Sequence, residues 1–323
     1  FPVMREQDRE VFERARRFVY RNARPLDLAR WKYHFENGSE QEVLAALSAY
    51  QNEDGGFGHG LEEDNMNPHS IPMQAWRATV ALRELEGLHK SEAIVQKLLG
   101  YLARTSEFDG EKWSYVVASN NDFPHASWWT YYHASWYQDT DKERFIRRYN
   151  PTASLAGFIL RYGDVDSDFW QKALGIAKES VEALFQLGDP QDMHVLSCFV
   201  QLWEDIGAAG LSGSFDMDRL TALLQELVSA TITQDISKWE TDYICKPSQF
   251  FNRKESVFYD RNREVAQYEC AFVRKTQMSD GSYAVNWSWD DYPDAWAVSR
   301  NWWSAEITVN NMIYLNNMVQ EEY

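Results

Sequence analysis

The stretch Gln51-Asn52-Glu53-Asp54-Gly55-Gly56-Phe57-Gly58-His59-Gly60-Leu61 marks the abrupt end of a predicted helix. Just before it, apolar side chains recur with the i, i+3, i+4, i+7 spacing of one helix face, at Val43, Ala46, Leu47 and Tyr50. Two adjacent glycines permit backbone angles with φ > 0, which other residues resist. The Asp54 carboxylate can bond N–H groups of the turn, and the Gln51 amide can do the same. We therefore predict a positive φ at Gly55 or Gly56.

Two further stretches share this pattern. The segment Gln277-Met278-Ser279-Asp280-Gly281-Ser282-Tyr283 aligns with the first stretch without a gap, from the Gln through the Asp-Gly pair to the aromatic residue. The segment Ser106-Glu107-Phe108-Asp109-Gly110-Glu111-Lys112-Trp113 keeps the Asp-Gly and the aromatic residue, lacks the Gln and has one residue more. We interpret 51–61 and 277–283 as two copies of a repeat and 106–113 as a degenerate third copy. Repeats this far apart indicate a supersecondary unit that is used several times around one core.

The pattern Gln-x-x-Asp-Gly-Gly-Phe followed by a helix resembles the QW-type repeat of squalene and hopene cyclases. That repeat also occurs in the β subunits of protein prenyltransferases and in related α/α toroids. The resemblance implies an all-α (α/α)6 toroid, in which six pairs of helices form two concentric rings and the inner ring encloses a cavity. A repeat at helix ends holds the scaffold and does not perform the reaction, so other residues must indicate the function.

Length and hydrophobic pattern agree with a single helical domain over residues 1–323. No linker rich in Pro, Gly or Ser divides the chain, and a 44% hydrophobic content is ample for a core. There is no βαβ alternation and no series of strands. About a dozen helices are predicted, as six pairs require; the clearest lie at 5–21, 25–35, 39–51, 73–85, 91–104, 153–160, 166–187, 189–206, 215–232, 263–277 and 304–318. Helices that begin near Pro72, Pro124 and Pro151 are predicted to form part of the inner ring.

Charge and cysteine content restrict the partners and the compartment. The chain has 32 Lys and Arg against 49 Asp and Glu, and its net charge of −17 argues against nucleic acid and anionic membranes as general partners. Its apolar runs are too short to span a membrane. Three cysteines without CxxC spacing predict neither a disulfide framework nor a cysteine-rich zinc site. The first ten residues lack the apolar core of a signal peptide, so we expect a cytoplasmic protein, although a leader trimmed before Phe1 is compatible with this start.

The acid motif of class II terpene cyclases, Asp-x-Asp-Asp, has only a partial counterpart. In those enzymes a carboxyl group must stay protonated until it donates its proton to an alkene. The segment Asp164-Val165-Asp166-Ser167-Asp168 lacks the last Asp and is predicted to be an exposed N-cap before Phe169.

The diphosphate motif of class I terpene enzymes, Asp-Asp-x-x-Asp, has a literal match at Asp290-Asp291-Tyr292-Pro293-Asp294. Carboxylates at i, i+1 and i+4 can share magnesium ions from one helix face. Pro293 lies where that helix would have to run, so we favour a loop or a helix start. Cys245 and Cys270 have no His nearby in sequence and are predicted to be buried structural residues, and the HExxH, P-loop, GxSxG and Rossmann patterns are absent.

The remaining candidates are carboxylates, histidines and tryptophans near the mouths of the presumed inner helices. The candidate catalytic residues are Glu62, Glu63, Asp64, Asp290, Asp291 and Asp294. The candidate substrate-binding residues are His59, His69, Trp76, His125, Trp128, Trp129, Trp287 and Trp289. Aromatic faces can stabilise carbocations or stack on sugar rings, although packing between helices explains most tryptophans. Both acidic segments follow a Gln-x-x-Asp-Gly turn by a similar distance, so we expect them at the same end of the barrel.

Three functions fit these observations. The first, implied by the resemblance, is an isoprenoid-acting enzyme, cyclase-like or prenyltransferase-like, with a small apolar substrate in an aromatic cavity. The second is a carbohydrate-active hydrolase or lyase, because α/α toroids also host such enzymes and carboxylates amid tryptophans suit glycosidic bonds. The third is a toroid that binds without catalysis. The sequence assigns no metal ligands and no cofactor.

Overall fold

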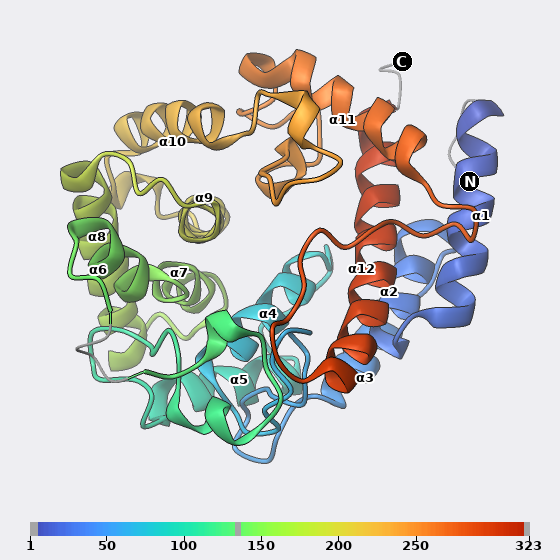
Figure 1. The fold of residues 1–323 in the computed structure, drawn as a ribbon. Helices are drawn as coiled ribbons and strands as arrows, with labels where there is room; N and C mark the ends of the chain where they lie inside the picture. The colour runs from blue at the N-terminus through green and yellow to red at the C-terminus, as the bar shows by residue number, and fades with distance from the viewer. Residues whose placement is uncertain (1–5, 133–136, 320–323) are drawn as a thin grey trace. The chain divides into compact units, whose positions relative to one another are not determined.

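The computed structural model describes residues 6–132 and 137–319. In these residues it contains α-helices, short 3₁₀ turns and isolated bridges but no β-strand, which confirms the predicted all-helical class (Figure 1). The helices are α1 (Glu6–Asn22), α2 (Pro25–Phe35), α3 (Glu40–Ser48), α4 (Pro72–Arg83), α5 (Ala93–Arg104), α6 (Asp141–Tyr149), α7 (Thr152–Tyr162), α8 (Asp168–Leu187), α9 (Met193–Ala208), α10 (Met217–Thr231), α11 (Arg263–Thr276) and α12 (Pro293–Val319).

The chain forms two compact units, each with its own packed helices. The terminal unit comprises residues 1–47 and 232–323, and in it α12 packs against α1, α2 and α11. The central unit comprises residues 48–231, and its centre is α7, which packs most extensively against α8 and α9 and also contacts α4 and α6. Every residue of α7 except Arg161 is buried. The central unit contains the acidic loop before α4 and all three candidate histidines.

Several residues from which helix starts were predicted occupy the positions that their chemistry favours. Pro25 and Pro72 occupy the first turns of α2 and α4, where proline loses no helical hydrogen bond. Ser39 accepts a hydrogen bond from the Glu42 N–H at 3.2 Å, as an N-cap should. Pro151 directly precedes α7.

The prediction of a helix that begins near Pro124 is wrong. Residues 118–122 and 127–129 form two 3₁₀ turns, and the chain between them is extended. The backbone there pairs with the acidic loop instead, because Met66 N–H donates to Pro124 O at 3.0 Å and Ala126 N–H donates to Asp64 O at 2.8 Å. These bonds use the backbone groups that a helix would need.

The last helix is longer than predicted and begins at Pro293 instead of Ser304. Its first turns carry partly exposed indole groups in place of a continuous apolar stripe, so periodicity did not reveal them. One of these indoles, on Trp302, lies 4.9 Å from the guanidinium carbon of Arg24.

The first repeat forms a closed turn. Gln51 Nε2 donates to Gly55 O at 3.0 Å within the turn and to Ile94 O of α5 at 3.1 Å. The Asp54 carboxylate accepts from Gly56 N–H at 2.9 Å. Gly55 has a φ of 88°, which confirms the positive φ predicted for this pair of glycines.

The second repeat makes the same bonds. Gln277 Nε2 donates to Gly281 O at 3.1 Å and to Val11 O of α1 at 2.9 Å. Asp280 accepts from Ser282 N–H at 2.9 Å, and Gly281 has a φ of 94°. The sequence alignment of the two copies therefore corresponds to one local structure.

Each of these turns also packs closely on its helix. A Cβ at Gly55 would lie 2.0 Å from Lys97 O, and a Cβ at Gly281 would lie 2.2 Å from Arg14 O. Lys97 follows the Gln51 acceptor by three residues, and Arg14 follows the Gln277 acceptor by the same number. Each turn thus docks on the backbone of its own helix with the same spacing between contacts. In each case the contact is made at a glycine that has no room for a side chain.

The degenerate copy lacks this docking. Gly110 has a φ of 97°, and Asp109 accepts from the N–H groups of Glu111 and Lys112 at 2.9 and 2.8 Å. Among the described residues, a Cβ at Gly110 would approach Lys172 Nζ alone, at 3.6 Å. The loss of the Gln therefore coincides with the loss of the helix contact.

Comparison of three glycine substitutions separates backbone strain from helix docking. We expect Gly110→Ala to lower the free energy of unfolding by about 1 kcal/mol, the usual cost of a side chain at positive φ. Gly55→Ala and Gly281→Ala should each cost more than about 2 kcal/mol, because the strain is combined with a backbone clash. Urea unfolding followed by circular dichroism measures the differences. Equal effects at all three sites would contradict the docking role.

Candidate functional site

The acidic loop before α4 is fastened to the first turn of that helix. Gln74 Oε1 accepts from Glu62 N–H at 2.5 Å, and Gln74 Nε2 donates to Glu62 O at 3.2 Å and to Asn65 O at 3.1 Å. The loop therefore lies at the N-terminal end of α4, as the sequence predicted.

The carboxylates of this loop lie inside the protein. Glu62, Glu63 and Asp64 are all buried, and Glu63 Oε1 lies 4.0 Å from Nη2 of the equally buried Arg77. A buried carboxylate beside a buried guanidinium holds the loop in place.

Amide and imidazole groups complete this buried polar region. Asn120 Oδ1 accepts from the side-chain amides of Asn65 and Asn67 at 2.9 and 3.1 Å. His125 lies between Phe123 O at 2.6 Å and Thr130 Oγ1 at 3.0 Å. His125 thus has a structural position in the loop that pairs with the acidic segment.

The other histidines and two tryptophans of the prediction lie nearer the surface. His59 is exposed and its Nε2 lies 2.7 Å from Asn52 Oδ1, whereas His69 meets the edge of Phe123 at 5.6 Å between ring centroids. Trp128 is 43% exposed, and Trp129 packs against Tyr115 at 5.7 Å.

The second acidic segment lies in the terminal unit, at the start of α12. Asp290 and Asp291 precede the helix and Asp294 lies in its first turn, so the three carboxylates do not share one helix face. This agrees with the helix start favoured from sequence. Because the two acidic segments belong to different units, their common location stays a prediction.

The tryptophans beside this segment pack on other aromatic rings. Trp289 is buried against Trp296, and Trp287 lies edge-on to Trp303 at 5.0 Å. Packing explains both positions.

Metal-ligand types do not gather in the part of the chain that the structure describes, where no group of three or more His, Cys, Asp or Glu side chains could hold an ion. Cys198, Cys245 and Cys270 are buried free thiols, which confirms the burial predicted for Cys245 and Cys270. The Asp164 segment is an exposed turn, although Ser167 and not an Asp caps α8 by accepting from Trp170 N–H at 3.1 Å.

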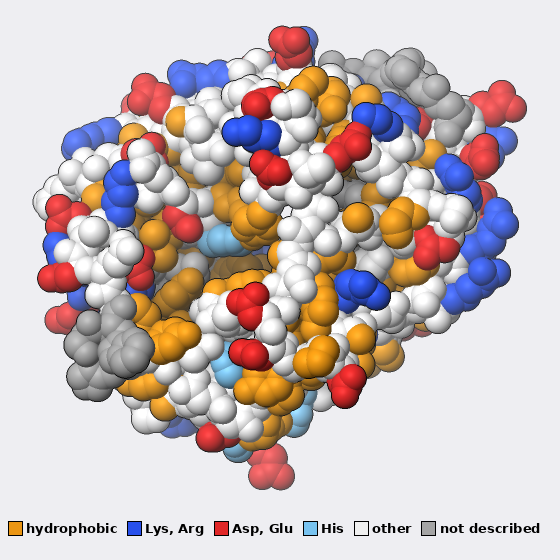
Figure 2. Space-filling view, in the orientation of Figure 1, with side chains coloured by type: hydrophobic (Ala, Val, Ile, Leu, Met, Phe, Trp, Pro, Cys, Tyr) orange, Lys and Arg blue, Asp and Glu red, His pale blue; other side chains and the backbone are white. Residues whose placement is uncertain are grey.

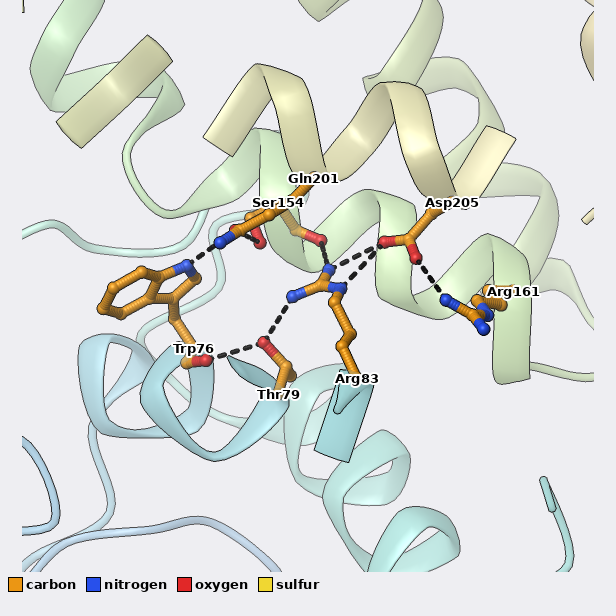
Figure 3. Close-up of polar contacts among 7 residues, drawn as sticks. All are labelled: Trp76, Thr79, Arg83, Ser154, Arg161, Gln201 and Asp205. Atoms are coloured by element: carbon orange, nitrogen blue, oxygen red, sulfur yellow. Dashed lines mark hydrogen bonds and ion pairs between the residues drawn. The ribbon is translucent and has the colours of Figure 1, made fainter. Parts of the chain in front are cut away.

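A polar network that the sequence did not predict connects α4, α7 and α9 in the central unit (Figure 3). At its centre Asp205 of α9 is fully buried. Its Oδ2 accepts from Arg83 Nη2 at 2.7 Å and from Arg83 Nε at 3.2 Å, and its Oδ1 lies 3.5 Å from Arg161 Nη1. One carboxylate thus contacts guanidinium groups from two other helices.

Arg83 extends this network to further acceptors on α4 and α7. Its Nη1 donates to Thr79 Oγ1 at 2.8 Å, and its Nη2 donates to Ser154 O of α7 at 2.9 Å. All three nitrogens of this guanidinium therefore have protein acceptors. The residue serves to hold α4, α7 and α9 together.

Gln201 lies one helical turn before Asp205, and its amide has a fixed orientation. Trp76 Nε1 donates to Gln201 Oε1 at 3.0 Å, and Ser154 Oγ donates to the same oxygen at 2.6 Å. An indole N–H can only donate, so the atom facing it must be the amide oxygen. The NH₂ group of Gln201 consequently points away from Trp76, and no acceptor for it is found among the residues that the structure describes.

Glu204 lies on the exposed side of α9. Desolvation by the surrounding protein disfavours the charged form of its carboxyl group and raises the pKa to about 7. The neighbouring Asp205 carboxylate adds to this rise, and the charges of Arg83 and Arg161 oppose it. Glu204 therefore exchanges its proton near neutral pH.

One stripe of α9 combines these accessible polar groups. His194, Gln201 and Glu204 follow one another at i, i+7 and i+10, and they lie within one quadrant of the helix surface. Desolvation by the surrounding protein lowers the pKa of His194, and the charge of Asp192 opposes this shift. The half-buried indole of Trp76 borders this stripe at Gln201. We regard Trp76, Gln201, Glu204 and Arg161 as the candidate site.

A sequence signal for this site exists. On α9 the buried stripe runs through Cys198 and Leu202 at spacings that place Asp205 on the same core face. A carboxylate at a core position requires a buried partner. Trp76 is the single member of the candidate site that the sequence indicated.

The surface gives little further guidance. Acidic, basic and hydrophobic side chains are interspersed over the face drawn in Figure 2. Among the described residues, no helix has the length and apolar character needed to cross a bilayer.

Comparison with known proteins gave no match among protein families, curated proteins or solved structures.

The ion pair at the centre of the network should dominate the stability of the central unit. We expect Asp205→Ala to lower the free energy of unfolding by about 3–5 kcal/mol, because Arg83 would keep a buried charge without its partner. Asp216→Ala removes an exposed carboxylate that caps α10 and should cost about 1 kcal/mol. Denaturant unfolding of both variants measures the difference. Similar small losses would contradict a central role for Asp205.

The raised pKa of Glu204 predicts a pH-dependent stability. The folded protein holds the Glu204 proton up to about pH 7, whereas the unfolded chain releases it near the ordinary value of 4.5. Folding therefore loses stability as the pH rises between these values, and Glu204→Gln abolishes that loss. We expect the melting temperature of Glu204→Gln minus that of wild type to increase from pH 5 to pH 8. A constant difference would refute the shift, and Glu226→Gln on the exposed face of α10 controls for charge removal.

Proposed function

We propose that the central unit binds a hydroxyl-rich small molecule of the carbohydrate class and that Glu204 acts on it as a general acid. The observation that carries the proposal is an accessible carboxyl group with a pKa of about 7, beside the oriented amide of Gln201 and the indole of Trp76. Indole faces stack on sugar rings, and the amide N–H groups suit sugar hydroxyls.

The magnitude of the pKa favours this chemistry over alkene protonation. A general acid works best when its pKa lies near the working pH, which suits proton donation to a leaving oxygen. An alkene is a far weaker base and needs a stronger acid than a carboxyl group of pKa about 7. The carbohydrate alternative therefore has more support than the isoprenoid one, which the sequence placed narrowly first.

In the proposed cleavage of a glycosidic bond, Glu204 is the proton donor. Glu204 donates its proton to the leaving-group oxygen as the carbon–oxygen bond breaks. Water then bonds to the carbon, and its released proton returns to the Glu204 carboxylate. Asp205 is committed to Arg83 and Arg161, so its role is to hold the helices and not to attack the substrate.

We further propose that the helices form the (α/α)6 toroid that the resemblance to QW-type repeats implies. Support comes from the two docked turns. The turn after α3 docks on α5, and the equivalent turn after α11 docks on α1 at the other end of the chain. Such a return to the first helix is what closure of a ring of helix pairs requires.

The test of function is a panel of oligosaccharides, with release of reducing ends as the measure of turnover. We expect wild-type turnover to fall as the pH rises through about 7, because the general acid must carry its proton. Glu204→Gln should lower kcat by about 10²–10⁴-fold. Glu226→Gln should retain wild-type turnover.

The competing function predicts a different outcome. A melting-temperature increase with prenyl diphosphate and magnesium, lost in Asp290→Asn/Asp291→Asn, would favour the isoprenoid function. Binding of sugars without any turnover would leave a binding protein and would overturn the catalytic role of Glu204.

A further inference from the structure

The candidate site carries an uncompensated positive charge. Arg83 on α4 and Arg161 on α7 contribute two positive charges, and Asp205 on α9 contributes one negative charge. When Glu204 holds its proton, the balance of these four groups is therefore +1. This is unusual in a chain whose net charge is −17. A positive site in an acidic protein favours an anionic ligand group.

Only one of the two arginines has donors to spare. Arg83 is nearly buried, and each of its nitrogens bonds to the protein. The side chain of Arg161 is 31% exposed, and its one hydrogen bond among the described residues runs from Nη1 to Asp205 at 3.5 Å. Its guanidinium carbon lies 5.1 Å from the ring centroid of Tyr162, which restricts its orientation. The edge formed by Nε and Nη2 thus remains open to a ligand.

We propose that this edge of Arg161 binds a carboxylate of the substrate, so that the substrate is an acidic sugar of the uronic acid type. The inference rests on the proposed carbohydrate function and names its substrate class. The Nε and Nη2 groups of a guanidinium donate two parallel hydrogen bonds that match the two oxygens of a planar carboxylate. Arg161 Nη1 lies 3.5 Å from Asp205 Oδ1, and Asp205 directly follows Glu204 on α9, so the bound carboxylate would lie near the acid.

The binding should depend on the charge of Glu204. Below about pH 7 the local charge is +1, and above it the ionised Glu204 cancels that charge and repels the ligand. Arg83, Arg161 and Asp205 are the other charged groups that act on Glu204. An acidic sugar should therefore bind more weakly at pH 8 than at pH 6, whereas a neutral sugar should bind nearly equally at both.

Isothermal titration calorimetry of the full chain tests the inference with three probes: an oligogalacturonate, a neutral galactose oligomer of equal length, and inorganic pyrophosphate. We expect wild type to bind the oligogalacturonate roughly 10–100-fold more tightly than the neutral oligomer, the range for hydrogen bonds to a charged group. Arg161→Met should abolish this preference and keep neutral binding. Arg161→Lys, which retains the charge without the fork, should keep part of it, and it also serves if Arg161→Met does not fold.

Arg219→Met is the matched control, because Arg219 also lies over an aromatic ring, that of Phe185 at 4.1 Å. It should bind all three probes as wild type does. Equal weakening of both sugars by Arg161→Met would overturn the carboxylate subsite and leave the proposed function intact. Binding of pyrophosphate through Arg161, with no sugar binding at all, would overturn both.

Discussion

The contact between Asp205 and Arg83 is the interaction on which the central unit depends. Two charges taken out of water are tolerated only when each finds full partners. Asp205 has them in Arg83 and Arg161, and Arg83 has them in Asp205, Thr79 and Ser154. Every one of these bonds joins or orders α4, α7 and α9. The same network fixes the position of Glu204 relative to Trp76, so scaffold and candidate site share one set of bonds.

A second constraint acts at the ends of α3 and α11. There the absence of a side chain allows a turn to lie directly against a helical carbonyl, at Lys97 in one case and at Arg14 in the other. The glutamine of each turn adds a hydrogen bond one helical turn away. Backbone contact of this kind tolerates changes in the surrounding side chains. This contact explains why the two copies of the repeat share a short sequence pattern although their other residues differ.

Local chemistry made the helices and turns predictable, whereas the site depended on partners distant in sequence. Proline positions, the Ser39 cap and the Asp-Gly turns could be interpreted from neighbouring residues alone. The region around Pro124 could not, because its backbone bonds lie with residues 64 and 66. Glu62, Glu63 and Asp64 drew attention as consecutive charges, yet Arg77 and burial give them a structural setting. Asp205 was missed because a single acid in an apolar helix reveals its importance only beside Arg83.

The docking of α1 on the turn at residues 277–283 has a consequence for the order in which the chain can fold. The hydrogen bond from Gln277 to Val11 joins residues 266 positions apart, and α1 also packs along α12. Helix α1 can pack on α2 early, but its contacts with α12 and with the turn at 277–283 need residues far along the chain. Residues 48–231 between them form the central unit, which is compact by itself and can fold before these contacts are made. These contacts of α1 are therefore of the kind that forms slowly, because they join residues that are far apart in sequence.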